Sequence, residues 1–497
     1  MQNLIPEQIA AAPLGLEANP VVTGLWQVAD MERDDKVLDR DAAAAALMRY
    51  VDAGFHCFDM ADHYGSAELI AGQARQQLLQ HGHPAADKLR LYTKWCPQPD
   101  QHTPTEVDAG IRNRLDRLGV DCIDLLQLHW WHFDHPGYID VMDHLCRLQQ
   151  DGLIKHLGLT NVDTDHLQVL LSCGFPIVSN QVCVSVLDPR ALGDLSDVCN
   201  DSGVGLLAYG SLAGGLLSER WLGAPEPTEL SDWSKMKYQR FVNAVGGWDV
   251  LQGVLGTLNE IAEHHQVSIA NVATRWVLQQ QAVAGVIVGA RLTEREHCES
   301  NRKVLEFELS GDDLARIQET QQSLTPIPGD CGSEYRRPPF LTASGDLSHH
   351  LDALPSVYQR VAVPGRKQRW YISSGSEYEP ICGYSRGVRT GNRILISGTT
   401  ATHGVDRVIG EDDLRAQMVY ILDKISASIA SLGGSLEDVV RTRIYLTDAA
   451  HWEVVSRVHG RYFSDILPAN TLIEISRLVG PYAIEMEAEA ILDTDAD

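Results

Sequence analysis

The chain lacks three features that would assign it to a specialised class of protein. It has no run of about 20 apolar residues, so we predict no membrane-spanning segment. Its ten cysteines are scattered and form no C-x-x-C pair, which excludes the familiar zinc ribbons and redox pairs and suits a reducing compartment. The N-terminus has no basic segment followed by an apolar one, which argues against a secretory signal. We therefore expect a cytoplasmic protein.

Positive charge is also scarce. The sequence has 41 Lys and Arg against 67 Asp and Glu, a formal net charge of -26. Such a surface repels phosphate backbones and anionic membranes, so we expect neither nucleic acid nor membrane as a partner. The remaining composition is that of an ordinary globular protein, with 44% hydrophobic residues, and 497 residues suffice for two domains.

Short apolar runs within residues 20–320 predict the first domain. Eight such runs alternate with helix-length amphipathic stretches, of which residues 104–119 are the clearest. The runs lie at residues 21–29, 56–62, 91–95, 122–130, 156–160, 178–184, 205–210 and 285–290. Eight strands alternating with helices favour a parallel (β/α)8 TIM barrel over residues 1–325. An open doubly wound sheet is the alternative, but its glycine-rich dinucleotide-binding motif is missing. The nearest candidate is Gly203-x-Gly205, which is a weak match.

The pattern changes after residue 325. Residues 326–376 are rich in Pro, Gly and Ser and are predicted to be a linker. In residues 377–497, strands are predicted at 392–400, 439–448, 471–478 and 482–492, with amphipathic helices at 413–433 and 451–466. This order predicts a smaller α+β domain with two helices on one face of a sheet.

Four polar residues follow neighbouring strands of the predicted barrel. Asp59 and Tyr64 follow the second strand, Lys94 ends the third, and His129 ends the fourth. Because barrel enzymes carry their chemistry at these strand ends, the four side chains can converge in one pocket. The set suits carbonyl reduction: a lysine lowers the pKa of a neighbouring tyrosine from about 10, so that it can protonate the carbonyl oxygen. Asp59 would hold Lys94, and His129 could donate a hydrogen bond to that oxygen.

The motifs around these residues resemble those of the aldo-keto reductase family. They are F-D-M-A-D-H-Y-G-S-A-E (58–68), T-K-W (93–95) and L-Q-L-H-W (126–130), followed in order by segments 156–161, 178–182, 206–215 and 287–291. The resemblance implies an NAD(P)H-dependent oxidoreductase that reduces an aldehyde or ketone, or oxidises the alcohol. Tyr64 would be the general acid, supported by Lys94, Asp59 and His129.

The same resemblance implies where the cofactor binds. Several residues match the family's cofactor-binding positions. Thr160, Asn161 and Gln181 match those that bind the nicotinamide carboxamide, and Tyr209 matches the aromatic residue that stacks on the nicotinamide ring. Gly210, Ser211 and Leu212 match the pyrophosphate positions, and Gly289, Arg291, Arg295 and Asn301 match the adenosine-phosphate positions. A guanidinium suits bidentate recognition of a 2′-phosphate, so Arg291 and Arg295 favour NADPH over NADH.

Aromatic residues and histidines surround the predicted pocket. Four tryptophans are candidates for its apolar wall, although core packing explains them almost as well: Trp26, Trp95, Trp130 and Trp131. The segment HWWHFDH (129–135) contains three histidines that could form a metal cluster. No helical i, i+4 spacing or cysteine partner supports that interpretation, and we expect no metal.

Segments 394–400, 441–448, 467–478 and 484–490 resemble the RidA (YjgF-like) family of enamine/imine deaminases, which has a chorismate-mutase-like fold. The resemblance implies a trimer with clefts between subunits. Active deaminases carry an Arg directly after Pro-Ala, but here that residue is Asn470, which lacks the charge and the fork geometry. Glu485 matches the position that orients the hydrolytic water.

We therefore expect the RidA-like domain to be a trimerisation or ligand-binding module, and the chain to be a homo-oligomer acting on a small-molecule carbonyl substrate. Two alternatives remain open. In one, the RidA-like domain hydrolyses an imine and the barrel reduces the carbonyl released. In the other, the chain is a non-enzymatic redox sensor that binds NADPH.

Overall fold

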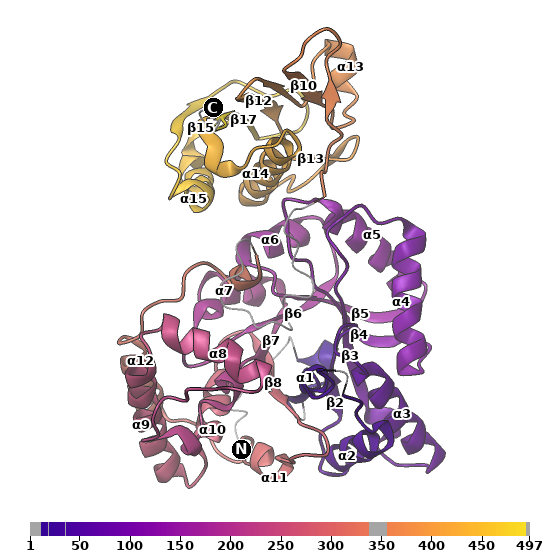
Figure 1. Ribbon diagram of the computed structural model, residues 1–497, viewed down its shortest axis with the longest axis vertical. Coiled ribbons are helices and arrows are strands. Elements are labelled where there is room, and N and C mark those ends of the chain that lie inside the picture. The colour runs from indigo at the N-terminus through magenta and orange to yellow at the C-terminus, as the bar shows by residue number, and fades with distance from the viewer. Residues whose placement is uncertain (1–10, 18, 35, 337–354, 494–497) are drawn as a thin grey trace.

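The computed structural model describes residues 11–17, 19–34, 36–336 and 355–493. It consists of an N-terminal barrel and a smaller C-terminal domain that lies over one side of it (Figure 1). The fold class predicted from the sequence is confirmed in both parts.

The barrel closes in sequence order, with β1 paired to β8 so that Val22 lies beside Ile287. Its strands are β1 (Val21–Gly24), β2 (Cys57–Asp59), β3 (Arg90–Trp95), β4 (Ile123–Leu128), β5 (Ile154–Thr160), β6 (Ile177–Cys183), β7 (Gly205–Tyr209) and β8 (Val283–Gly289). Nearly every strand residue is buried, because the helices cover the outer face and side chains fill the interior. This explains why the strands contain short, largely apolar runs rather than a regular alternation of polar and apolar residues.

The outer helices follow from local sequence signals. In α4 (Pro104–Leu118), Thr103 and Glu106 form a capping box and Pro104 occupies the first turn. Gly119 ends the helix in the left-handed conformation, at φ 61°. The other barrel helices are α1 (Gln27–Met31), α2 (Arg40–Asp52), α3 (Ala67–Gln80), α5 (Gly137–Gln150), α6 (Thr164–Ser172), α7 (Asp194–Ser202), α8 (Trp233–Ala244), α9 (Trp248–His265), α10 (Ile269–Leu278), α11 (Cys298–Lys303) and α12 (Gly311–Gln321).

The C-terminal domain is a sheet of seven strands in the order β16-β15-β17-β12-β11-β10-β9. These are β9 (Val361–Ala362), β10 (Arg369–Ile372), β11 (Gly387–Thr390), β12 (Arg393–Thr399), β15 (Val439–Leu446), β16 (Ala469–Glu474) and β17 (Ile484–Ile491). The predicted helices are α14 (Leu414–Ser431) and α15 (Trp452–Phe463), which pack against each other, while α14 also covers β12 and β17. The smaller elements are α13 (Tyr378–Cys382), β13 (Thr402–His403) and β14 (Arg407–Val408).

The segment expected to be a linker is partly structured. β9 and β10 fall within it and extend the second sheet at one edge. The expectation missed them because both strands are short and lie in a stretch without regular apolar alternation. At the other end, residues 327–336 pack back onto the barrel, whereas residues 337–354 lie outside the described residues.

The two domains contact each other mainly through α6 of the barrel and α14 of the C-terminal domain, which lie side by side (Figure 1). Acidic residues of the barrel meet basic residues of the C-terminal domain. Asp165 pairs with Arg415 and Arg461, each at 2.6 Å, and Asp143 pairs with Arg407 at 2.6 Å.

No helix within the described ranges has both the length and the apolar character needed to cross a membrane.

Candidate active site

A cavity of about 380 Å³ opens at the C-terminal ends of the barrel strands. Tyr64, His129, Asn161 and Tyr209 line it, coming from the segments after β2, β4 and β5 and from the end of β7. This is the position at which the barrel fold places its chemistry, because the loops after the strands converge there.

A buried ion pair lies at the base of the cavity. Nζ of Lys94 is 2.6 Å from Oδ2 of Asp59 and 2.9 Å from the carbonyl oxygen of Met60. The other carboxylate oxygen of Asp59 accepts hydrogen bonds from Gln127 at 3.0 Å and Gln181 at 2.8 Å. Both carboxylate oxygens are therefore engaged, and the lysine is held in one position.

This ion pair lies beside the ring of Tyr64. Burial lowers the pKa of Lys94, whose side chain is 1% exposed, while the charge of Asp59 opposes the shift. Nζ lies 5.0 Å from the centroid of the Tyr64 ring. A cation fixed beside a phenol stabilises the phenolate, so the arrangement suits a tyrosine that gives up its proton.

Asn161 connects the ends of three strands. Its side-chain nitrogen lies 3.2 Å from Nε2 of His129, and its side-chain oxygen accepts a hydrogen bond from the Tyr209 hydroxyl at 2.8 Å. Burial raises the pKa of Tyr209, so this hydroxyl stays protonated and can donate. Asn161 has a φ of 55°, a left-handed conformation that directs its side chain into the cavity just after β5.

The cavity offers hydrogen-bonding groups that fit a dinucleotide. The hydroxyls of Thr160 and Ser211 line it, are buried, and have no hydrogen-bond partner among the described residues. Buried hydroxyls without partners are uncommon, and these two can serve a bound carboxamide or phosphate. Gly210 has a φ of 73°, and a Cβ there would lie 2.3 Å from the Tyr238 hydroxyl, so only glycine fits at this point of the backbone.

Cationic side chains gather at the far end of the cavity. Arg291 forms ion pairs with Asp30 at 2.8 Å and with Glu294 at 2.6 Å. Arg220 and Arg295 also line the cavity and form no ion pair with any described residue. This end of the site therefore suits an anionic group, with Arg220 and Arg295 as the available cations.

Most of the residues predicted for the site lie together in the structure. The cavity is lined by all of the residues expected to bind the cofactor and by three of the four expected to act in catalysis: Thr160, Asn161, Gln181, Tyr209, Gly210, Ser211, Leu212, Gly289, Arg291, Arg295 and Asn301, with Asp59, Tyr64 and His129. Lys94 lies directly behind the cavity wall, where it contacts Asp59.

The expected tryptophans divide into two pairs. Trp26 and Trp131 line the cavity, whereas Trp95 and Trp130 lie in the core. Trp130 is 1% exposed, and Trp95 packs against α4 at Gly110.

Sequence reasoning missed several residues of the cavity, among them Arg220, Lys237 of α8 and Tyr335 of the 3-10 turn η6 (Ser333–Tyr335). The Tyr335 hydroxyl lies 3.2 Å from that of Tyr209 and forms a hydrogen bond with Nζ of Lys237. Its ring packs edge-on against Trp131, with centroids 5.3 Å apart. No local signal could have identified Tyr335, because its segment has the composition of a linker.

The structure does not bring the two predicted RidA-like residues together within one chain. Asn470 donates a hydrogen bond to Thr442 at 2.9 Å on the helix-covered face of the sheet. Thr442 lies on β15 and is the register partner of Asn470. Tyr445 lies three positions further along β15 and is the register partner of Glu485. Because side chains alternate between the two faces of a sheet, Glu485 lies on the face opposite to Asn470. Burial raises the pKa of Glu485, whose carboxylate occupies the space beside Gly398.

No group of three or more His, Cys, Asp or Glu that could hold a metal ion occurs in the part of the chain that the structure describes.

Comparison with known families agrees with this division of the chain. A sequence model described as the aldo/keto reductase family matches residues 20–322. A second, described as endoribonuclease L-PSP, matches residues 374–492.

Among curated proteins, the NADH-specific methylglyoxal reductase of Escherichia coli K12 is 25% identical over 317 residues, covering 61% of this chain and 94% of that protein. The flagellar radial spoke protein 5 of Chlamydomonas reinhardtii is 34% identical over 174 residues, and the match spans 31% of this chain and 33% of that protein.

Two solved structures are similar to parts of the chain. A glycerol dehydrogenase from Gluconobacter oxydans superposes with a TM-score of 0.50 at 22% identity, covering 63% of this chain and 94% of that one, and shares the barrel fold. A YjgF/YER057c/UK114 family member from Mycobacterium tuberculosis is 39% identical, covers 25% of this chain and 99% of its own, and has a TM-score of 0.23.

Proposed function

The chain belongs to the aldo/keto reductase family, and we propose that it reduces an aldehyde or ketone, or oxidises the alcohol, with Tyr64 as the general acid–base group. The observation that carries this proposal is the buried pair of Lys94 and Asp59 beside Tyr64, inside a cavity with dinucleotide-binding groups.

Each residue of the site has a distinct part in the reaction. When bound, a nicotinamide dinucleotide supplies the hydride that adds to the carbonyl carbon. Tyr64 gives its proton to the carbonyl oxygen as negative charge develops there. Lys94 stabilises the phenolate that remains, and Asp59 keeps Lys94 in place. His129 lies at the same cavity and can orient the oxygen by a hydrogen bond.

We further propose NADPH as the cofactor. Thr160 and Asn161 would bind the carboxamide, and Ser211 the pyrophosphate. Arg220 and Arg295, which have no ion pair with described residues, would bind the 2′-phosphate, while Arg291 is already paired with carboxylates. Because a relative is an NADH-specific enzyme, the ratio of kcat/KM with NADPH to that with NADH is the measurement that decides this point.

For the C-terminal domain we propose a role in assembly or ligand binding rather than deamination. Asn470 carries no charge to grip a carboxylate, and its side chain already bonds to Thr442. Because Glu485 lies on the other face of the sheet, a cleft containing both residues would need a second subunit. Light scattering of the purified chain would show whether it forms the expected trimer.

The experiment that tests the main proposal is a Tyr64→Phe substitution, assayed by NADPH consumption with aldehydes, ketones, sugars and cyclic imines. We expect turnover to fall by about 10²–10⁴-fold because a positioned general acid contributes this much, while NADPH still binds. Tyr138→Phe, which removes a buried hydroxyl from α5 outside the cavity, is the matched control. Full activity of Tyr64→Phe contradicts the proposal, and NADPH binding without turnover by the wild type would favour the redox sensor.

A further inference from the structure

The backbone of Asn161 is held by two groups that come from distant parts of the chain. Its N–H donates to the carbonyl of Gln181 at 2.9 Å, and its carbonyl accepts a hydrogen bond from Arg336 at 2.7 Å. A left-handed conformation is costly for a residue with a side chain and persists only where its surroundings enforce it. A shift of this backbone would move the side chain that contacts both His129 and Tyr209.

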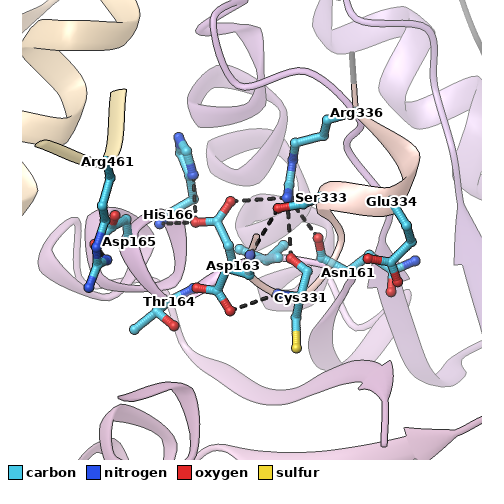
Figure 2. Close-up of polar contacts among 12 residues, drawn as sticks. Asn161, Asp163, Thr164, Asp165, His166, Cys331, Ser333, Glu334, Arg336 and Arg461 are labelled. Carbon is cyan, nitrogen blue, oxygen red and sulfur yellow. Dashed lines mark hydrogen bonds and ion pairs between the residues drawn. The ribbon is translucent and has the colours of Figure 1, made fainter. Parts of the chain in front are cut away.

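Arg336 reaches this carbonyl from the segment that follows the barrel. Its other terminal nitrogen lies 3.2 Å from Oδ2 of Asp163, and its guanidinium lies 4.8 Å from the centre of the Phe133 ring. Gly332 packs on the same carbonyl so closely that a Cβ would lie 2.1 Å from its oxygen. Figure 2 shows Arg336 between Asn161 and Asp163, bridging the two.

Asp163 in turn contacts His166, one turn along α6. Its Oδ1 accepts hydrogen bonds from the backbone N–H of His166 at 2.9 Å and from Nδ1 at 2.7 Å. The far nitrogen of the ring, Nε2, lies 3.0 Å from Oδ2 of Asp423, which belongs to α14 of the C-terminal domain. The Tyr462 hydroxyl donates to the other oxygen of Asp423 at 2.8 Å.

The surroundings of His166 favour the charged form of its imidazole. Burial disfavours the charged ring, but the carboxylates of Asp163 and Asp423 outweigh it and raise the pKa of His166 to about 10. Both ring nitrogens then donate, one to each domain. The ring also stacks on Phe133, with centroids 3.9 Å apart.

We propose that Arg336, Asp163 and His166 are positioning residues through which the docked C-terminal domain holds Asn161 in its cofactor-binding conformation. The chain of contacts runs from Asp423 through His166, Asp163 and Arg336 to the Asn161 carbonyl, and each group contacts the next directly. The inference rests on the proposed role of Asn161 in binding the nicotinamide.

Another inter-domain contact provides the matched control. Arg407 pairs with Asp143 of α5 at 2.6 Å and stacks near Phe175, and none of these residues lines the cavity. Arg407→Gln therefore removes an inter-domain ion pair without touching the path to Asn161.

The test measures the Kd for NADPH of the full-length chain by quenching of tryptophan fluorescence, together with kcat, KM and the melting temperature. We expect Kd to rise at least fivefold in Asp423→Asn and at least tenfold in Arg336→Gln. Arg336→Lys, which keeps the charge but lacks the guanidinium fork that reaches both Asn161 and Asp163, should lie between wild type and Arg336→Gln. The double variant Asp423→Asn/Arg336→Gln should bind no worse than Arg336→Gln alone, because both changes break one path.

The outcomes separate three explanations. If Asp423→Asn and Arg336→Gln bind NADPH within twofold of wild type, the positioning role is wrong while the proposed reductase stands. If Arg407→Gln weakens NADPH binding as much as Asp423→Asn, general loosening of the domain contact is responsible and the positioning role is again wrong. If the wild-type chain binds no nicotinamide dinucleotide, the proposed function and this inference fail together.

Discussion

Removing one charge of the Lys94–Asp59 pair tests the electrostatic basis of the site. Asp59→Asn keeps the shape of the side chain but leaves the Lys94 ammonium, which is 1% exposed, without its counter-charge. Its remaining acceptors would be the Met60 carbonyl and an amide oxygen. Breaking a buried ion pair from one side typically costs about 3–5 kcal/mol, so we expect a loss of this size in the free energy of unfolding.

The reverse substitution should cost less. In Lys94→Met the carboxylate of Asp59 still accepts hydrogen bonds from Gln127 and Gln181, so we expect a loss of about 2 kcal/mol. The double variant removes both buried charges and should lose clearly less than the sum of the two single losses, with a coupling energy of about 2 kcal/mol or more. All three variants should lose carbonyl reduction, because Tyr64 loses its neighbouring cation or the group that fixes it.

Urea unfolding followed by tryptophan fluorescence measures these losses. Eight of the ten tryptophans lie in residues 1–325, so the signal reports on the barrel even if the domains unfold separately. A loss below about 1 kcal/mol for Asp59→Asn, or a double variant as unstable as the two single losses added together, would refute a buried, mutually compensated pair.

Three further predictions concern other parts of the network. The pKa of His166 is raised from 6.5 to about 10, so its contribution to stability is complete below pH 6.5 and is lost as the pH rises toward 10. The His166→Gln variant lacks this titration. Its melting temperature should therefore fall less steeply between pH 6 and pH 10 than that of the wild type. Arg295→Gln should raise the KM for NADPH about tenfold and leave that for NADH unchanged, and equal effects on both would remove Arg295 from the phosphate site. Gly332→Ala should weaken NADPH binding by its clash with the Asn161 carbonyl, whereas Gly365→Ala, at a similar φ of 75° but with open space around it, should change stability alone.

The barrel and the core of its site could be predicted because their signals are local. Buried parallel strands are short apolar runs, and the topology then brings the residues after neighbouring strands to one end of the barrel. Asp59, Tyr64 and His129 line one cavity in the structure for this reason, and Lys94 lies directly behind Asp59. The roles of these residues in catalysis remain predictions.

The path of residues 327–336 could not be predicted. Its position depends on contacts that are distant in sequence: Arg190 bonds to Asp188, to the carbonyl of Asp330 and to Glu334. Composition alone gives such a segment the character of a linker. Tyr335 therefore reaches the cavity through tertiary contacts that no periodicity reveals.

The net charge of -26 describes the surface as a whole but not the contact between the domains. At that contact the barrel supplies carboxylates and the C-terminal domain supplies guanidinium groups, of which Arg461 and Arg407 are 41% and 32% exposed. Exposed pairs of this kind contribute about 0–1 kcal/mol each, so they can steer docking without fixing its geometry. The buried ring of His166 differs, because any docking that displaces Asp423 would leave its Nε2 without a carboxylate while Asp163 holds only Nδ1. The orientation of the C-terminal domain, and with it the placement of Asn161, thus depends more on this buried contact than on the ion pairs of Arg461 and Arg407.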